Sequence, residues 1–349
     1  MRKILISIIT IFCMILIGCN GKISNIYNIS TTVFVDSAGI DYNKETKKYT
    51  LYYHSPSSFA LITSEMGSGG VENTYHIAKT ECDSIYDGIK IIAQNSERSI
   101  LLTHIRSFIF TENFLTIDNL NMFNEFIKTY KYITTDFAIY TTKDKIDEIY
   151  SLRNTDNNSY YSILTELDNT IPYKTIKYYE FANAAVEPHR QIMFQTIKKN
   201  DNIWESEKDK LTSVQLNGMT LVKDEEILTL DALDYKFILI MYNNYYTTIN
   251  IENTSFNLIN TSFSITEKKV KIKSEVYATN VGENNSEELI GKLEKYIINL
   301  FEEFFYETAS KGYDPFQIKD LLYRKGKLKD DFNLETISFK YDINLKLLN

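Results

Sequence analysis

Apolar residues in the first half of the chain follow two spacings, one typical of strands and one typical of helices. Strands are predicted in four stretches rich in β-branched and aromatic residues, at 31–35, 49–53, 99–110 and 136–141. Helices are predicted where apolar residues recur every three or four positions, at 83–95, from 116 or 118 through Ile127, and at 143–152. This alternation predicts a layer of helices on a sheet, in an α/β or α+β arrangement.

Polar residues at the element boundaries refine these predictions. The charged stretch 42–48 lies between two strand-like runs and predicts the turn of a hairpin or meander. Thr80 or Asp83 is expected to cap the first helix, and Thr116 or Asp118 the second, because such side chains accept hydrogen bonds from the free N–H groups at a helix start. The apolar face of the second helix consists of Leu120, Phe123, Phe126 and Ile127.

The middle of the chain contains two polar stretches that we expect to separate folding units. Residues 153–159 are poor in apolar side chains, and residues 199–210 are charged around Trp204. Helical pieces are predicted between these stretches, to about residue 198. Beyond them, 214–221 is predicted to be a strand pair about Asn217-Gly218, a dipeptide favoured in type I′ hairpins.

The last third of the chain is dominated by alternating strands and one long helix. Strands are predicted at 245–251, 256–265, 270–279 and 334–347. The helix covers 286–310, stops at Lys311-Gly312, and is followed by a short helix that Asp314 caps and that runs through Tyr323. One side of the long helix is apolar, at Leu289, Leu293, Ile297, Leu300, Phe301, Phe304 and Phe305.

We therefore predict an α+β fold, a multi-domain mix of mainly antiparallel sheets with flanking helices and the long helix in the C-terminal domain. The predicted division is a leading segment at 1–18, an N-terminal α/β-type region at 19–200 with an internal seam near 153–159, and a C-terminal α+β domain at 201–349.

The first 19 residues have the organisation of an export signal. Arg2 and Lys3 precede an apolar run, 4–17, that is shorter than the roughly 20 residues needed to cross a hydrocarbon core. The run closes on Leu16-Ile17-Gly18-Cys19, which resembles a bacterial lipobox, whose cysteine is lipidated and becomes the first mature residue. We expect a lipoprotein signal peptide at 1–18 and acyl chains, such as palmitate, on Cys19. An ordinary secretory signal and an uncleaved anchor helix are the alternatives.

Charge excludes one class of partner, and cysteine usage leaves one thiol. The formal net charge of −8 becomes −10 when Arg2 and Lys3 leave with the signal, so the body lacks the overall basic character of nucleic-acid-binding proteins. With Cys13 removed and Cys19 lipidated, Cys82 remains, and we expect it to be a buried hydrophobic residue on a helix.

Motifs for catalysis and metal binding are missing from the sequence, which contains no His-Glu-x-x-His, Cys-x-x-Cys or Gly-x-Ser-x-Gly pattern. Residues 67–70 are glycine-rich, but Glu72 stands where a dinucleotide-binding motif needs a glycine, so a surface loop is predicted. The acidic groups 224–226 and 302–303 are expected to be solvated. The histidines are far apart in the chain, at His54, His76, His104 and His189. We expect no catalytic residue, no cofactor, no metal ion and no enzyme activity.

The order of several weak motifs along the chain indicates a family. The motifs stand in this order along the chain: the lipobox, then Gly39-Ile40-Asp41, then 101–106 after the first predicted helix, then 216–225, and last 311–316 after the long helix. In this order the chain resembles the C subunit of bacterial spore germinant receptors, a lipoprotein family of Ger(x)C-like spore germination proteins. It departs from the family at Asn20-Gly21-Lys22, where Trp-Asp is common, and at 325–332, which lacks a tryptophan, so it is a divergent member.

The resemblance implies a three-domain mix of sheets and helices and a non-enzymatic scaffold or interaction role in germination signalling. It implies partners, the integral-membrane A and B subunits of a nutrient receptor, and a membrane location on the outer face of the spore inner membrane, held by the lipid on Cys19. Direct binding of a small molecule stays open.

Two other functions are weighed against this one. A solute-binding lipoprotein of a membrane transporter would normally fold as two doubly wound lobes, which the late strands and long helix do not suit. A lipid-anchored hydrolase is disfavoured by the missing motifs.

Overall fold

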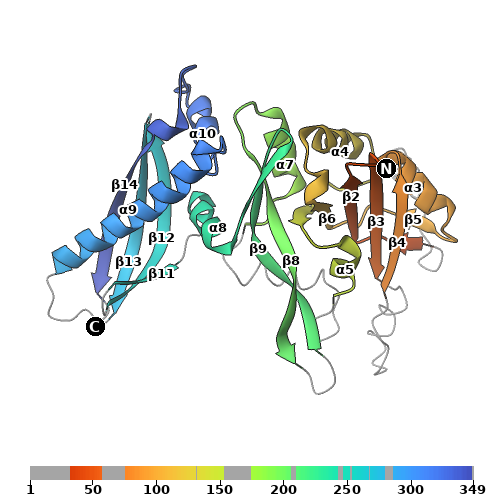
Figure 1. The fold of residues 1–349 in the computed structure, drawn as a ribbon, viewed down its shortest axis with the longest axis horizontal. Helices are drawn as coiled ribbons and strands as arrows, with labels where there is room; N and C mark the ends of the chain where they lie inside the picture. Colours follow the sequence, from red (N-terminus) through yellow and green to blue (C-terminus); the bar gives the residue numbers. More distant parts are fainter. Residues whose placement is uncertain are drawn as a thin grey trace, which may run out of the picture.

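The computed structural model describes residues 32–56, 75–130, 132–152, 174–205, 210–242, 247–251, 254–266, 268–279 and 286–347. The predicted signal peptide, Cys19, the glycine-rich stretch 67–70 and the seam 153–159 lie outside these residues. The fold is α+β, as predicted, and the described strands form an eight-stranded, a four-stranded and a two-stranded sheet (Figure 1).

The eight-stranded sheet has the order β10-β9-β8-β7-β6-β2-β3-β4. Its central strands β2, β6, β7 and β8 are parallel, and the strands at both ends are antiparallel. Its strands are β2 (Ser37–Asn43), β3 (Lys48–Pro56), β4 (Tyr75–Cys82), β6 (Ser107–Thr111), β7 (Ala138–Thr142), β8 (Ile192–Glu205), β9 (Lys210–Lys223) and β10 (Glu226–Leu230). The parallel centre explains the strand–helix alternation of the N-terminal half, because parallel strands need crossover connections.

Helices pack on both faces of this sheet. One face carries α3 (Ile85–Gln94), α4 (Ile117–Thr129) and α7 (Tyr178–Val186), and the other carries α5 (Ile146–Tyr150). The predicted helices at 83–95, 116–127 and 143–152 are therefore present. Thr116 caps α4 as predicted, its hydroxyl accepting from the Asn119 N–H. Ser84 caps α3, in place of Thr80 or Asp83, because β4 continues to Cys82 and only then does the chain turn into the helix.

Phe123 of α4 lies at the centre of the core between these helices and the sheet. The side chain is completely buried, and its ring centroid lies 5.0 Å from that of Phe108 and 4.9 Å from that of Phe110. Four further rings lie around it, those of Phe126, Phe137, Tyr178 and Phe181. The apolar face predicted for this helix is therefore the face that folds against the sheet.

Three predictions for the N-terminal half are wrong in detail. The predicted strand 99–110 is two strands, β5 (Ser99–Leu101) and β6, and β5 pairs with β1 (Thr32–Phe34) in a separate parallel pair. The strand is interrupted near Arg106, whose N–H donates to the Asp36 carbonyl, 2.8 Å away. At this point the chain leaves the β1–β5 pair. The predicted hairpin exists, but its first strand is β2, which includes Gly39-Ile40-Asp41, and not 31–35. Cys82 is buried, as predicted, but it ends strand β4 and does not lie on a helix.

The prediction of a hairpin turn at Asn217-Gly218 is also wrong. Strand β9 continues through this dipeptide, with Leu216 opposite Ile197 and Met219 opposite Gln195 on β8. Both residues of the dipeptide therefore face one residue of β8, which is a β-bulge. Gly218 adopts φ +95°, which bulge and turn both require of a glycine.

The polar stretch 199–210 falls on the long hairpin of β8 and β9. The described ends of this stretch, 199–205 and 210, therefore belong to paired strands and not to a linker. The prediction of helical pieces up to residue 198 is wrong beyond α7, because residues 192–198 belong to strand β8. The division of the chain at residue 200 stays a prediction, and β8 runs across that point.

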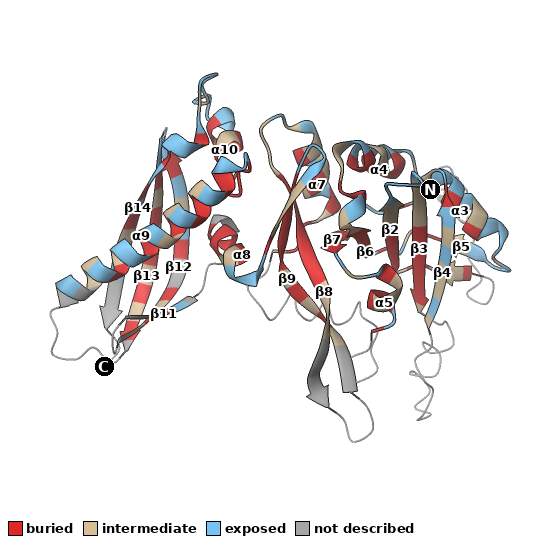
Figure 2. Cartoon of the chain, viewed as in Figure 1, coloured by how far each residue is buried: buried red, intermediate tan, exposed pale blue. Residues whose placement is uncertain are grey.

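The C-terminal sheet has the order β11-β12-β13-β14 and carries α9 (Ser286–Ser310) across one face (Figure 1). Its strands are β11 (Thr247–Ile251), β12 (Thr254–Thr266), β13 (Lys269–Thr279) and β14 (Ser338–Leu347). These elements match the sequence predictions closely. Figure 2 shows the buried stripe of α9, and its described members are Leu293, Ile297, Phe301, Phe304 and Phe305.

Shorter elements complete the fold: α8 (Ala232–Ile238), α10 (Ile318–Arg324) and the 3₁₀ turns Glu112–Phe114, Leu239–Tyr242 and Leu334–Thr336. Gly312 ends α9 at φ +83°, its N–H donating to the Ala309 carbonyl at 2.8 Å. Asp314 accepts from the Lys319 N–H at 2.8 Å and so caps α10 from four residues before its start.

The segment before α10 joins the C-terminal part to β8. Gln191 and Gln317 exchange two hydrogen bonds of 3.0 and 2.9 Å between the side chain of Gln317 and the backbone of Gln191. Arg324 of α10 pairs with Glu187, which follows α7, at 2.7 Å. Asp314 is fully buried at this junction, and burial raises the pKa of its carboxyl to about 6. One apolar cluster continues from Met193 and Met219 into the core beneath α9.

Among the described residues no helix is long and apolar enough to cross a membrane. The longest, α9, carries six glutamates and two lysines along its 25 residues.

Candidate functional site

The residues that the sequence singled out as candidate chemistry lie apart in the structure. His54 and His76 belong to neighbouring strands but point to opposite faces, since His54 is opposite Ile77 and His76 opposite Ser55. His104 and His189 pack against aromatic rings elsewhere. Within the described ranges no three His, Cys, Asp or Glu side chains are grouped closely enough to hold a metal ion.

The acidic and aromatic groups have the surroundings that the sequence predicts. Asp224, Glu225 and Glu226 are exposed at the turn between β9 and β10. Phe301, Phe304 and Phe305 are core residues of the C-terminal sheet.

A buried polar cluster beneath α5 was not predicted. His54 is completely buried on β3, and its Nδ1 lies 2.7 Å from the Asp36 carboxylate. Nearby, the hydroxyls of Ser37, Ser107 and Tyr150 are linked by hydrogen bonds of 2.9 and 3.0 Å. These hydrogen bonds join β2, β6 and α5, and the bonded residues are 70 to 113 positions apart in the chain. A local sequence motif therefore could not predict them. Their burial suits a structural role, in which polar groups satisfy one another in the core.

A polar hollow of about 340 Å³ lies where β6 and β7 end. Its carboxylates already have partners, which hold the surrounding loops. Asp41 accepts from the Thr111 hydroxyl, Glu112 from the Thr229 hydroxyl at 2.8 Å, and Asp144 from the Lys199 N–H at 2.6 Å. Glu112 also pairs with Lys143 at 3.5 Å.

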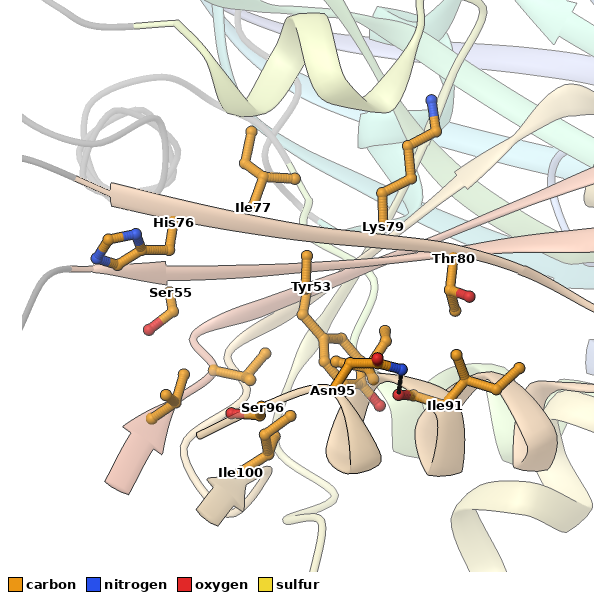
Figure 3. A pocket seen from close by; sticks show the side chains of 14 residues that line it. Tyr53, Ser55, His76, Ile77, Lys79, Thr80, Ile91, Asn95, Ser96 and Ile100 are labelled. Carbon is orange, nitrogen blue, oxygen red and sulfur yellow. Dashed lines mark hydrogen bonds between the residues drawn. The ribbon is translucent and has the colours of Figure 1, made fainter. Parts of the chain in front are cut away.

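The best-formed pocket of the described chain lies between strands β3 and β4, helix α3 and the small β1–β5 pair (Figure 3). It has a volume of about 390 Å³, enough for a small organic molecule. Its apolar lining consists of Val33, Val35, Ala78, Ile91, Ile92 and Ile100. The pocket exists because β1 pairs with β5 and stands away from the large sheet, which leaves a space over the apolar side of α3.

Polar groups around this pocket are few. Figure 3 shows Tyr53 extending from β3 toward α3, and its buried hydroxyl has no hydrogen-bond partner among the described residues. Burial raises the pKa of this phenol. The Asn95 amide donates to the Ile91 carbonyl at 2.8 Å, and Ser55 and Ser96 contribute hydroxyls.

Charged side chains point away from the pocket or stand at its rim. Lys79 lies on the far side of β4, where its Nζ is 3.2 Å from Asp147 and 5.0 Å from the centre of the Tyr52 ring (Figure 3). His76 is exposed at the open end of the strand. The lining therefore suits an uncharged, largely apolar molecule and offers no charged partner to a zwitterion.

We expect small uncharged apolar compounds to raise the melting temperature of the protein, because a ligand that binds only the folded state stabilises it by mass action. Amino acids, sugars and nucleosides should leave the melting temperature unchanged. In Ala78→Phe the new ring fills the pocket, and the shift should disappear. Val186→Phe, at a position that is 67% exposed and away from the pocket, is the matched control. A strong shift with an amino acid or a sugar would favour the solute-binding alternative instead.

Comparisons with known proteins were informative for the N-terminal half of the chain. Residues 25–199, half of the chain, match the family model described as spore germination protein N-terminal domain. The crystal structure of the GerBC protein is 14% identical, with a TM-score of 0.45 over 89% of this chain and 97% of that one. No curated protein matches the sequence. The family match confirms the resemblance drawn from the order of the motifs, and the chain belongs to the family of spore germination proteins that form the C subunits of germinant receptors.

Proposed function

We propose that this protein is the lipid-anchored, non-enzymatic C subunit of a nutrient receptor, held on the outer face of the spore inner membrane beside integral-membrane A and B subunits. The observation that carries the proposal is the family match, which begins at residue 25, directly after the lipobox that ends at Cys19. A lipid on Cys19 would place the family domain against a bilayer, with a short tether between them.

The described surface supports a role in contacts more than in chemistry. The buried hydroxyls of Ser37, Ser107 and Tyr150 beneath α5 are engaged with one another, and the carboxylates of the polar hollow hold loops. Large hydrophobic residues are exposed at several places, among them Tyr132 at 64%, in the turn after α4, and Tyr179 of α7 at 51%. Exposed tyrosines are typical of protein contact surfaces.

The anchor is tested by replacing Cys19 with alanine in the producing organism. The variant should leave the membrane fraction for the soluble fraction almost completely, because no acyl chain can then be attached. The measurement is immunoblotting of both fractions, in cells that lack the proposed A and B subunits.

Cys82→Ala is the matched control, since it removes the other cysteine of the mature chain, and this variant should stay with the membrane.

The receptor role is tested in cells that make the A and B subunits, by purifying the protein from the membrane fraction. There the wild-type protein should co-purify with both subunits. Retention of Cys19→Ala in the absence of the partners would contradict the anchor.

A further inference from the structure

The outward face of the C-terminal sheet is rich in lysine. Val270 and Ile272 of β13 point inward to the core under α9, and the alternate residues Lys269, Lys271 and Lys273 point outward. Lys269 and Lys273 are exposed, and Lys271 is half-buried. This arrangement concentrates positive charge in a chain whose formal net charge is −8.

The strand register brings further residues beside these three. Lys340 of β14 lies opposite Lys271, Ser338 opposite Lys269, and Asp342 opposite Lys273. On the other side, β12 contributes hydroxyls, with Ser262, Ser264 and Thr266 opposite Lys273, Lys271 and Lys269. We call the four lysines 269, 271, 273 and 340 the lysine face.

One carboxylate serves two of these lysines. Asp342 lies 2.6 Å from the Lys271 Nζ and 3.1 Å from the Lys340 Nζ, and these ammonium groups lower the pKa of its carboxyl. Lys269 and Lys273 have no ion-pair partner among the described residues, so their charge is available to an external group.

A hollow of about 380 Å³ lies at one end of the lysine face. Lys268, Lys269 and Lys327 line it together with the hydroxyl residues Thr266 and Ser338. These described lining residues include no carboxylate, and Glu267 lies outside the described residues. Ammonium groups and hydroxyls around a space of this size suit an anion such as a phosphate group.

The opposite side of the same domain carries mixed charge. Helix α9 covers the inner face of the sheet, and its exposed charged residues include Glu288, Lys292, Lys295, Glu303 and Glu307. Glu288 pairs with Lys292 at 3.1 Å, and Glu307 pairs with Lys311 at 2.8 Å. The lysine face differs from this side because its lysines outnumber the carboxylate that pairs with them.

We propose that the lysine face and its hollow dock on the anionic phospholipid headgroups of the membrane to which the protein is tethered. This rests on the membrane location given under Proposed function. Lysine near an anionic bilayer contributes about 1 kcal/mol of attraction per residue. The outward residues of this part of the face are lysines and hydroxyl residues together with Asp342, whereas the cores of protein interfaces are enriched in aromatic residues and arginine and depleted in lysine. The composition therefore favours headgroups over a protein partner.

The test is a chemical footprint of the full-length lipidated protein on vesicles. The protein is inserted into vesicles of phosphatidylcholine alone, or of phosphatidylcholine with phosphatidylglycerol, and its lysines are acylated briefly and quantified by mass spectrometry. Labelling of Lys269 and Lys273 should fall severalfold on the anionic vesicles and recover at high salt, which screens the attraction. Lys90 on α3 and Lys128 on α4 are internal controls whose labelling should not change.

Charge-reversal variants distinguish a specific effect of the lysine face from an effect of the protein's net charge. In the double variant Lys269→Glu, Lys273→Glu, the protection of Lys271 and Lys340 should be lost. In the matched double variant Lys90→Glu, Lys128→Glu, which changes the net charge equally, it should persist.

Equal labelling of Lys269 and Lys273 on both kinds of vesicle would overturn the proposal. So would protection of these lysines only when a purified partner subunit is present, because the face would then bind protein. Retention of the protein on neutral vesicles reports the lipid anchor separately, so a failure of the anchor and a failure of the face are distinguishable.

Discussion

Phe123→Ala should lower the free energy of unfolding by about 3–5 kcal/mol, the usual cost of removing a fully buried phenylalanine. The effect is expected at the upper end of that range because six aromatic rings surround this side chain. Rigid rings from α4, α7, β6 and the residue before β7 cannot collapse easily into the space, so the cavity would stay largely open.

Urea denaturation followed by circular dichroism measures this loss. Tyr132→Ala is the control, because that ring is 64% exposed and its removal should change the free energy of unfolding by less than about 0.5 kcal/mol. A loss below about 1 kcal/mol for Phe123→Ala would show that the aromatic core is not packed around this residue.

Gly218→Ala is expected to cost roughly 3 kcal/mol or more, through two independent effects. The residue has φ +95°, a conformation that costs an alanine about 1–3 kcal/mol. A Cβ built there would also lie 2.0 Å from the Leu230 carbonyl oxygen. That oxygen belongs to the backbone of β10, so the clash can be relieved only by moving a strand of the sheet.

Gly291→Ala is a sharp control for this experiment. Gly291 lies in helix α9, and a Cβ there would meet nothing within 4 Å. Alanine is a better helix former than glycine, so this variant should gain up to about 1 kcal/mol. Melting temperatures of the two variants should therefore move in opposite directions. A neutral Gly218→Ala would contradict the bulge and would favour a flexible connection at this point.

The contrast between α9 and Asn217-Gly218 shows where sequence patterns suffice. The helix at 286–310 is predictable because its apolar side repeats every three or four residues over seven turns and its end is marked by glycine. The dipeptide Asn217-Gly218 indicates only that the backbone there can adopt a positive φ. Whether this makes a turn or a bulge depends on whether β9 stays paired with β8, which involves residues 19 to 24 positions away.

Strand β4 and the pocket illustrate the same limit. Residues 75–82 alternate weakly, because β4 is the last strand of its sheet and much of it is exposed or half-buried. The pocket is formed by residues that lie between positions 33 and 100 of the chain. The Tyr53 hydroxyl is buried there without a hydrogen-bond partner among the described residues, which can be recognised only when the neighbouring elements are in place.

The sequence by itself determined the α+β class, the amphipathic helices with their buried faces, the C-terminal strands and the family, because each of these is written in local periodicity, in capping residues or in the order of short motifs. The predicted lipid on Cys19 also has a local signal and stays a prediction. Only the tertiary structure decided the order of strands in the sheets, the bulge at Gly218, the pocket beside Tyr53 and the gathering of lysines on one face. These depend on pairing between segments distant in the chain, whose partners are selected by packing and hydrogen bonding in the whole fold.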